Sequence, residues 1–197
     1  PVTQVLHFLA KRQIKNNILV FQPENEIALV NMALGASFSG AKAMAGTSGG
    51  GFCLMTEGLS FAGMAELPVV IILGQRPGPS TGLPTYTCQT DLHFALSAGQ
   101  GEFGRFIIAP GDAEEAFVSS GLALVMAWKY QIPSLILSDK TLNEGVYNFD
   151  MASIKDFKIE GPATWDRKGE YKRYLNTDTG VSPLTFAPDK DAIVKVN

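Results

Sequence analysis

The sequence is poor in residues that bind metals or clusters, since its 197 residues include only two cysteines and two histidines. Cys53 and Cys88 form no Cys-x-x-Cys pair, so we expect no zinc or iron–sulfur site in this chain, and no other metal ligands cluster. A single disulfide between them is an alternative, but two reduced thiols in a cytoplasmic protein are the simpler interpretation. His7 and His93 accompany no nucleophile elbow, so the sequence offers no support for a hydrolase triad.

Charge is also scarce. Charged residues make up 18% of the chain, and the net charge is −3. No basic run and no interleaving of basic and aromatic residues occurs, which argues against a nucleic acid or an anionic membrane as a partner. No apolar run reaches the length of a membrane helix. We therefore expect a cytoplasmic globular protein whose weakly charged surface is partly covered by a substrate or a partner chain.

Short apolar runs alternate with helical patterns along most of the chain. The runs that predict strands cover residues 18–21, 43–47, 68–73, 105–109 and 133–137. The helical patterns cover residues 24–42, 52–62, 91–98 and a segment that follows residue 112. This order predicts an α/β fold, a doubly wound and mostly parallel sheet with helices on both faces.

The last of these helices has the clearest start signal. Asp112 is followed three residues later by Glu115, which is the spacing of a capping box. The pattern behind them places Phe117, Leu124 and Trp128 on one side of the helix.

After about Phe149 the periodic patterns stop. Residues 151–197 are richer in charge, glycine, proline and threonine, which predicts an extended arm or linker rather than a second core. We therefore divide the chain into an α/β domain at 1–150 and an arm at 151–197.

Three polar segments follow predicted strands. The first covers residues 22–27, where two acids, Glu24 and Glu26, open a predicted helix. The helix macrodipole favours carboxylates there, and this alone is a sufficient reason for them. Because acids at one helix end repel each other, Glu26 could instead be held against a ligand nitrogen.

The second segment covers residues 46–52 and contains Gly49-Gly50-Gly51. Backbone N–H groups at a helix N-terminus could hold an anion. No Lys-Ser or Lys-Thr follows, which excludes a P-loop, and the spacing does not match the dinucleotide fingerprint. A tight turn that lets helix and strand approach closely explains the glycines at least as well.

The third segment covers residues 75–85, with three prolines and two glycines in eleven residues. Such a loop is stiff, and Arg76 in it offers a planar, bidentate fit to a carboxylate or phosphate. The hydroxyls of Ser80, Thr81 and Thr85 could add hydrogen bonds. An ordinary surface turn is the alternative. Because the carboxyl ends of parallel strands meet at one edge of a sheet, we expect all three segments to form one binding site.

The residues of these segments resemble the α subunit of 2-oxoacid:ferredoxin oxidoreductases, and more specifically the 2-oxoglutarate type. The matching motifs are Glu24-Asn25-Glu26-Ile27-Ala28, Thr47-Ser48-Gly49-Gly50-Gly51-Phe52, Gln75-Arg76 and the string from Gly78 to Thr85. The resemblance covers nearly the whole chain. It implies the pyrimidine-binding domain of a thiamine diphosphate enzyme.

The resemblance also implies roles for single residues. Glu26 falls where the family's glutamate contacts the aminopyrimidine nitrogen N1′. Arg76 falls where the family's arginine binds the substrate carboxylate. The other expected contacts are Thr47, Ser48 and Gly49 to the cofactor, and Ser80 and Thr81 to the substrate.

The implied reaction is oxidative decarboxylation of a 2-oxoacid, with 2-oxoglutarate favoured, to an acyl-CoA, while ferredoxin takes the electrons. The implied partner is a β subunit that binds the diphosphate group in a hetero-oligomer, with Mg²⁺ and iron–sulfur clusters on partner chains. The lack of a Gly-Asp-Gly signature and of cysteine clusters here agrees with that division.

The chain departs from the family pattern at its start. The family carries a Tyr-Pro-Ile-Thr-Pro motif whose threonine contacts substrate, and Pro1 matches its second proline. We therefore expect a fragment, continued by a second domain, that does not turn over alone. The alternatives are a non-catalytic assembly or anion-binding module of the same fold, and the pyrimidine half of another thiamine enzyme. The string from Gly78 to Thr85 argues against the latter.

Overall fold

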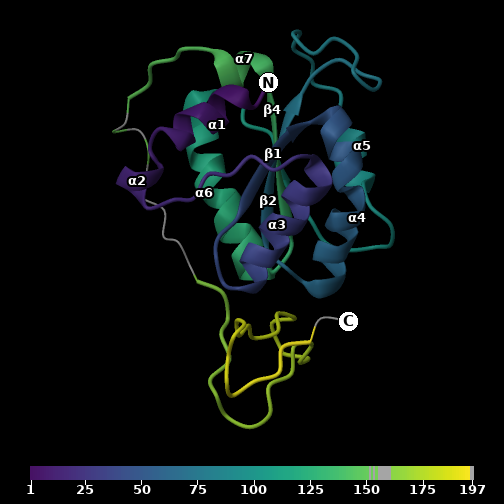
Figure 1. Cartoon of the computed structure of the whole chain (residues 1–197), viewed down its shortest axis with the longest axis vertical. Helices are drawn as coiled ribbons and strands as arrows, with labels where there is room; N and C mark the ends of the chain where they lie inside the picture. Colours follow the sequence, from purple (N-terminus) through teal and green to yellow (C-terminus); the bar gives the residue numbers. More distant parts are fainter. Residues whose placement is uncertain (151, 153, 155–160, 196–197) are drawn as a thin grey trace.

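The chain forms one parallel sheet between two helical layers (Figure 1). The computed structural model describes residues 1–150, 152, 154 and 161–195. The strands in this part are β1 (Met44–Ser48), β2 (Val69–Gln75), β3 (Phe106–Ile108) and β4 (Pro133–Asp139). The helices are α1 (Thr3–Ala10), α2 (Gln13–Asn16), α3 (Glu26–Phe38), α4 (Gly49–Ala65), α5 (Leu92–Ser97), α6 (Ala113–Tyr130) and α7 (Lys140–Glu144).

The strands run in the order β1-β2-β4-β3, and every pair is parallel. The register places Ser48 of β1 opposite Gly74 of β2, and Gln75 of β2 opposite Asp139 of β4. The carboxyl ends of these three strands therefore lie together at one edge of the sheet, at the top of Figure 1. A parallel sheet of this kind usually binds ligands at that edge.

The two faces of the sheet have separate cores, because successive side chains of a strand point to opposite sides. Ile71 and Leu73 of β2 pack with α3, α4 and α5 on one face. Val70 and Ile136 pack with Ala127 and other residues of α6 on the opposite face. This arrangement confirms the predicted doubly wound α/β fold.

Several element boundaries differ from the sequence-based expectation. The predicted strand at 18–21 is wrong: the segment is a loop, with Ile18, Leu19 and Phe21 exposed, and it pairs with no strand. The first long helix is shorter than expected and covers only Glu26–Phe38. On α6, Trp128 is buried as predicted, whereas Phe117 is half exposed.

The helix caps agree with the sequence. The Asp112 side chain accepts a hydrogen bond from the Glu115 backbone N–H at 2.8 Å. The Glu115 side chain reaches back to the N–H of Gly111, one residue before the position of an ordinary capping box. No helix within the described residues combines the length and apolarity needed to cross a bilayer.

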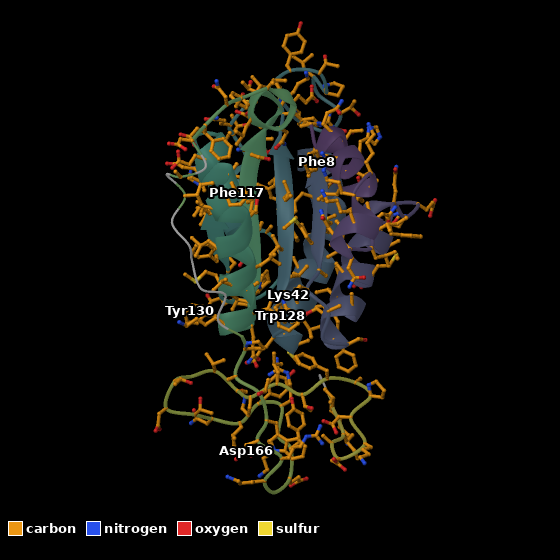
Figure 2. All side chains as sticks on the ribbon, turned by 90° about the vertical axis from the view of Figure 1, so that its left-hand side faces the viewer. Phe8, Lys42, Phe117, Trp128, Tyr130 and Asp166 are labelled. Carbon is orange, nitrogen blue, oxygen red and sulfur yellow. The ribbon has the colours of Figure 1, made fainter. Side chains whose placement is uncertain are left out.

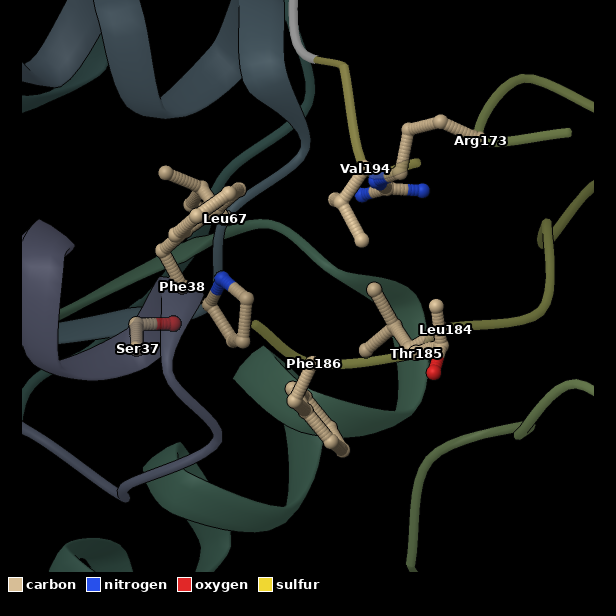
Figure 3. A pocket seen from close by; sticks show the side chains of 9 residues that line it. Ser37, Phe38, Leu67, Arg173, Leu184, Thr185, Phe186 and Val194 are labelled. Atoms are coloured by element: carbon tan, nitrogen blue, oxygen red, sulfur yellow. The ribbon is translucent and has the colours of Figure 1, made fainter. Parts of the chain in front are cut away.

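Residues 161–195 contain no helix or strand and lie at the amino ends of the strands, at the bottom of Figure 1. Leu184 joins the core on the α6 face, and the ring of Phe186 lies 5.9 Å from that of Trp128. Figure 2 shows Trp128 near this end of the sheet, above the segment that carries Asp166. The small pocket in Figure 3 lies at this contact, and its lining includes Ser37, Phe38, Leu67, Arg173, Leu184 and Phe186.

Candidate functional site

The first part of the candidate site joins α3 to β1. Asn25 caps α3 by accepting a hydrogen bond from the Ala28 backbone N–H at 2.9 Å, so Glu26 becomes the first residue of the helix. The buried Thr47 of β1 donates its hydroxyl to Oε1 of Glu26 at 3.3 Å. Within the described residues, Oε2 of Glu26 has no hydrogen-bond partner, which leaves this oxygen available to a ligand.

Gly51 makes this contact between Glu26 and Thr47 feasible. A Cβ at position 51 would overlap both Oγ1 of Thr47 and the Glu26 carboxylate. The residue lies in the first turn of α4 and not in a turn before the helix. Close approach therefore accounts for Gly51, although the elements that it brings together are α3, β1 and α4 rather than a turn and a strand.

Arg76 follows directly after β2 and links the second segment to the third. Its Nε donates to the Ser48 hydroxyl at 3.0 Å, and its Nη1 donates to the Thr81 carbonyl oxygen. Its Nη2 lies 3.6 Å from the position that a Cβ of Gly50 would take. Ser48, whose hydroxyl accepts from Arg76, makes no side-chain cap for α4, so the first turn of that helix keeps N–H groups for a ligand.

The loop from Pro77 onward is exposed and closes on itself. The Leu83 N–H donates to the Pro77 carbonyl at 3.1 Å, and Gly82 has a φ of +50°, where a Cβ would also overlap that carbonyl. The loop presents a Thr81 backbone oxygen to Arg76. The hydroxyls of Ser80 and Thr81 point to no protein partner within the described residues, so their contact with a substrate stays a prediction.

The end of this loop is fastened to β4. Gln89 donates its side-chain amide to Oδ2 of Asp139 at 2.8 Å. The other oxygen, Oδ1, caps α7 by accepting from the Leu142 N–H at 2.9 Å. Burial alone would raise the pKa of Asp139, but the hydrogen bonds from Leu142, Gln89 and neighbouring threonines together hold it below the usual range.

Gln75 and Asp91 lie in segments that match the family, but the sequence assigned neither of them a role. The buried Gln75 side chain accepts a hydrogen bond from the Asp91 backbone N–H at 3.0 Å. The Asp91 carboxylate lies against Gly49, whose Cβ position is 3.2 Å from Oδ2. Asp91 begins the predicted helix at 91–98 and directly precedes the observed α5, a position that favours a capping aspartate, but its side chain does not cap α5.

The structure therefore brings Glu26, Thr47, Ser48 and Arg76 to one edge of the sheet, as the three-segment hypothesis predicts. Gly49 lies between them and Asp91. No group of three or more histidine, cysteine or acidic side chains is placed to hold a metal within the described residues. Cys53 and Cys88 are free thiols.

Known proteins resemble this chain in sequence and in fold. The α subunit of 2-oxoacid:ferredoxin oxidoreductase 1 from Sulfurisphaera tokodaii is 45% identical over 175 residues, which is 87% of this chain and 28% of that protein. The 2-oxoglutarate synthase subunit KorA from Archaeoglobus fulgidus is 36% identical over 200 aligned positions, covering 100% of this chain and 58% of the subunit. This chain therefore spans little more than a quarter of the length of the first relative.

A solved structure agrees with these relatives. The 2-oxoglutarate:ferredoxin oxidoreductase from Magnetococcus marinus, with 2-oxoglutarate, coenzyme A and succinyl-CoA bound, matches with a TM-score of 0.90 at 35% identity. The match covers 100% of this chain and 34% of that one. A family profile described as pyruvate flavodoxin/ferredoxin oxidoreductase, thiamine diphosphate-binding, matches residues 1–189. The chain therefore belongs to the thiamine diphosphate-binding family of pyruvate flavodoxin/ferredoxin oxidoreductases.

Proposed function

We propose that this chain is the pyrimidine-binding part of the α subunit of a 2-oxoacid:ferredoxin oxidoreductase. The complete enzyme oxidatively decarboxylates a 2-oxoacid, with 2-oxoglutarate favoured, to an acyl-CoA and passes electrons to ferredoxin. The observation that carries the proposal is that two charged groups lie at one edge of the sheet. The Glu26 carboxylate is held there by Thr47, and the Arg76 guanidinium is held by Ser48. Membership of the family and the match to a 2-oxoglutarate enzyme support the choice of reaction.

Glu26 is the residue that would hold the cofactor's aminopyrimidine ring. Thr47 engages Oε1, and the space that Gly51 leaves open lets the carboxylate stay in this position. The remaining oxygen, Oε2, can share a proton with a ring nitrogen, so the residues present fit the group. When bound, thiamine diphosphate supplies the carbon nucleophile that the reaction requires.

Arg76 is the residue that would bind the substrate carboxylate. Its Nε and Nη1 already donate to Ser48 and Thr81, so the guanidinium is oriented before a ligand arrives. A cation held in place in this way orients the 2-oxo group and costs little reorganisation during reaction. The exposed loop hydroxyls of Ser80 and Thr81 add contacts to the same ligand.

The proposal divides the enzyme between chains. A β subunit binds the diphosphate group through Mg²⁺, and partner chains carry the iron–sulfur clusters that reduce ferredoxin, in a cytoplasmic hetero-oligomer. The relatives are named as α subunits, and this chain spans only 28% of the first of them, which supports a site completed by other domains and chains.

The test is turnover of the complete complex with pyruvate, 2-oxoglutarate and branched 2-oxoacids, using ferredoxin or a viologen dye as acceptor. We expect thiamine-dependent oxidation, with 2-oxoglutarate preferred. Arg76→Gln should raise KM for the 2-oxoacid on the order of tenfold to a hundredfold, because a charge-assisted contact is lost.

The control for this experiment is Arg12→Gln, because Arg12 is exposed between α1 and α2 and its side chain contacts only nearby Phe8 in the described structure. This variant should leave KM unchanged. A complex in which thiamine diphosphate has no effect on any 2-oxoacid would contradict the proposal and favour a non-catalytic assembly module of the same fold.

A further inference from the structure

Asp91 lies against Gly49, beside the site, without an assigned role. Its backbone N–H is fixed to the side chain of Gln75, which is 5% exposed, so the main chain of Asp91 is held at the end of β2. The side chain does not cap α5. The carboxylate is therefore free of the structural role that an aspartate at a helix start usually has.

The Asp91 carboxylate is enclosed but not paired. Its Oδ2 is buried and has no hydrogen-bond partner within the described residues. A buried carboxylate oxygen without a donor is costly, so such atoms are rare unless they serve a function. No ion pair joins Asp91 to Arg76 in the part of the chain that the structure describes.

Asp91 and Arg76 nevertheless flank the same two residues of α4. Oδ2 of Asp91 lies 3.2 Å from the Cβ position of Gly49, and Nη2 of Arg76 lies 3.6 Å from the Cβ position of Gly50. A Cβ at position 49 would crowd the Asp91 carboxylate, and one at position 50 would be in ordinary contact with the Arg76 guanidinium, so both charged groups lie against adjacent residues of the helix start. An anion that binds Arg76 here arrives within the field of Asp91.

The geometry points to a specificity-determining role: we propose that Asp91 opposes the carboxylate that Arg76 binds and so sets the affinity of the site for the 2-oxoacid. This inference rests on the proposed function. Asp91 acts through charge and does not touch the reacting atoms. Its effect is therefore on substrate binding rather than on the chemical step.

The protonation of Asp91 follows from this arrangement. Burial raises the pKa of Asp91 more than the charge of Arg76 lowers it. A bound anion offsets the Arg76 charge and adds repulsion, so the pKa rises further in the complex. Binding of the anion is thus accompanied by proton uptake at Asp91, and the affinity falls as the pH rises above the pKa of the free site.

Other charged or titratable groups on the surrounding elements are Glu26 on α3, Cys53 and Glu57 on α4, His93 on α5 and Asp139 at the end of β4. Of these, Asp139 is held charged by its hydrogen bonds, and Cys53, Glu57 and His93 are exposed. Glu26 is engaged by Thr47. Arg76 is the charged group that lowers the pKa of Asp91, against the effect of burial.

The test compares the complete complex carrying Asp91→Asn with wild type, using 2-oxoglutarate as substrate from the lowest pH at which the complex is stable up to pH 8. We expect KM at pH 8 to fall on the order of threefold to tenfold, with kcat within about twofold, because one repelling charge is removed. The increase of KM with pH should flatten in this variant. Asp178→Asn removes a charge from the exposed segment at the far end of the sheet and should reproduce wild type.

A second measurement follows binding without turnover. Glutarate, a dicarboxylate without the 2-oxo group, is titrated into the wild-type complex by calorimetry in buffers of different ionisation enthalpy. At a pH between the pKa of Asp91 in the free site and its higher pKa in the complex, net proton uptake is expected, and Asp91→Asn should abolish it. Binding without proton uptake, or a KM that rises in Asp91→Asn, would overturn the role of Asp91. If Arg76→Gln fails to weaken glutarate, the proposed function itself fails instead.

Discussion

At the scale of single residues, the site depends on a missing side chain. Gly51 leaves the gap in which the Glu26 carboxylate meets the Thr47 hydroxyl, and a methyl group would overlap both. This requirement opposes local preference, since alanine is favoured over glycine inside a helix by about 1 kcal/mol. Glycine at position 51 therefore lowers the stability of the helix but allows the contact between Glu26 and Thr47.

Gly51→Ala should consequently lower turnover of the complete complex by at least about tenfold, through displacement of the Glu26 carboxylate. Gly35 on α3 is the matched control, because a Cβ there meets nothing within 4 Å. Gly35→Ala should leave turnover unchanged and raise the free energy of unfolding by up to about 1 kcal/mol. Steady-state kinetics with thermal unfolding checks both variants, and equal activity of Gly51→Ala and wild type would refute the argument.

The sequence predicts this site unevenly. The motif positions identify Glu26 and Arg76, and the structure brings both to the same edge. The closeness of Gly51 to Glu26 could not be predicted, because it depends on how α3 and α4 pack together. The hydrogen bond from Asp91 to Gln75 was equally hidden, since it joins residues 16 positions apart across a loop.

At the scale of elements, the loop beginning at Pro77 is held at both ends. Arg76 binds its first turn through Thr81, and Asp139 binds its last part through Gln89 while it caps α7. Two oxygens of one carboxylate thus fasten a loop and a helix. In asparagine an NH₂ group replaces one of the two oxygens, so the donor that now bonds that oxygen loses its acceptor.

Asp139→Asn should therefore lower the free energy of unfolding by about 1–2 kcal/mol at neutral pH. The pKa of Asp139 is depressed in the folded chain, so its stabilisation is present above its ordinary value of 3.8 and is lost as the pH falls through the folded value. The difference in the free energy of unfolding between Asp139→Asn and wild type should therefore become smaller below pH 3.8.

Thermal unfolding measured between pH 3 and 7 tests this loss, and Asp112→Asn supplies the control. Asp112 caps α6 through one oxygen, a bond that asparagine makes equally well. A difference in stability between Asp139→Asn and wild type that stays constant down to pH 3 would contradict the stabilising role of the ionised Asp139 side chain.

The elements with a sustained pattern were predicted best. The four apolar residues that recur at helical spacing in the pattern at 52–62, Phe52, Met55, Leu59 and Ala62, are all fully buried on α4. Residues 18–21 failed because a short apolar run identifies a strand only if a neighbouring strand pairs with it. Leu19 is 88% exposed, so neither the sheet nor the core covers this run.

At the scale of the whole molecule, one arginine fastens residues 161–195 to the sheet end opposite the site. The nearly buried Arg173 pairs with Glu66 at 2.9 Å and donates to the carbonyls of Ala65 and Glu66 at the end of α4. The sequence predicts the absence of regular structure in this segment. Its anchor could not be predicted, because the contact spans more than 100 residues and follows no period.

Arg173→Ala should lower the free energy of unfolding by about 2–4 kcal/mol, because buried carbonyls and an acid lose their donor. Arg167→Ala is the control within the same segment: its pairs with Asp189 and Asp191 are largely exposed on the arginine side and contribute below about 1 kcal/mol. Denaturant unfolding measures both, and cleavage by a protease within residues 161–195 should accelerate only in Arg173→Ala. Comparable losses in the two variants would show that Arg173 is not the anchor.

The central claim is that Glu26 holds the cofactor ring, and the most direct measurement is turnover of the complete complex carrying Glu26→Gln. Glu24→Gln is the matched control, because it removes an equal charge from an exposed position two residues away. We predict that Glu26→Gln lowers kcat by at least about a hundredfold while unfolding stays unchanged, and that Glu24→Gln keeps full activity. Near-full activity of Glu26→Gln, or equal losses in both variants, would contradict the claim.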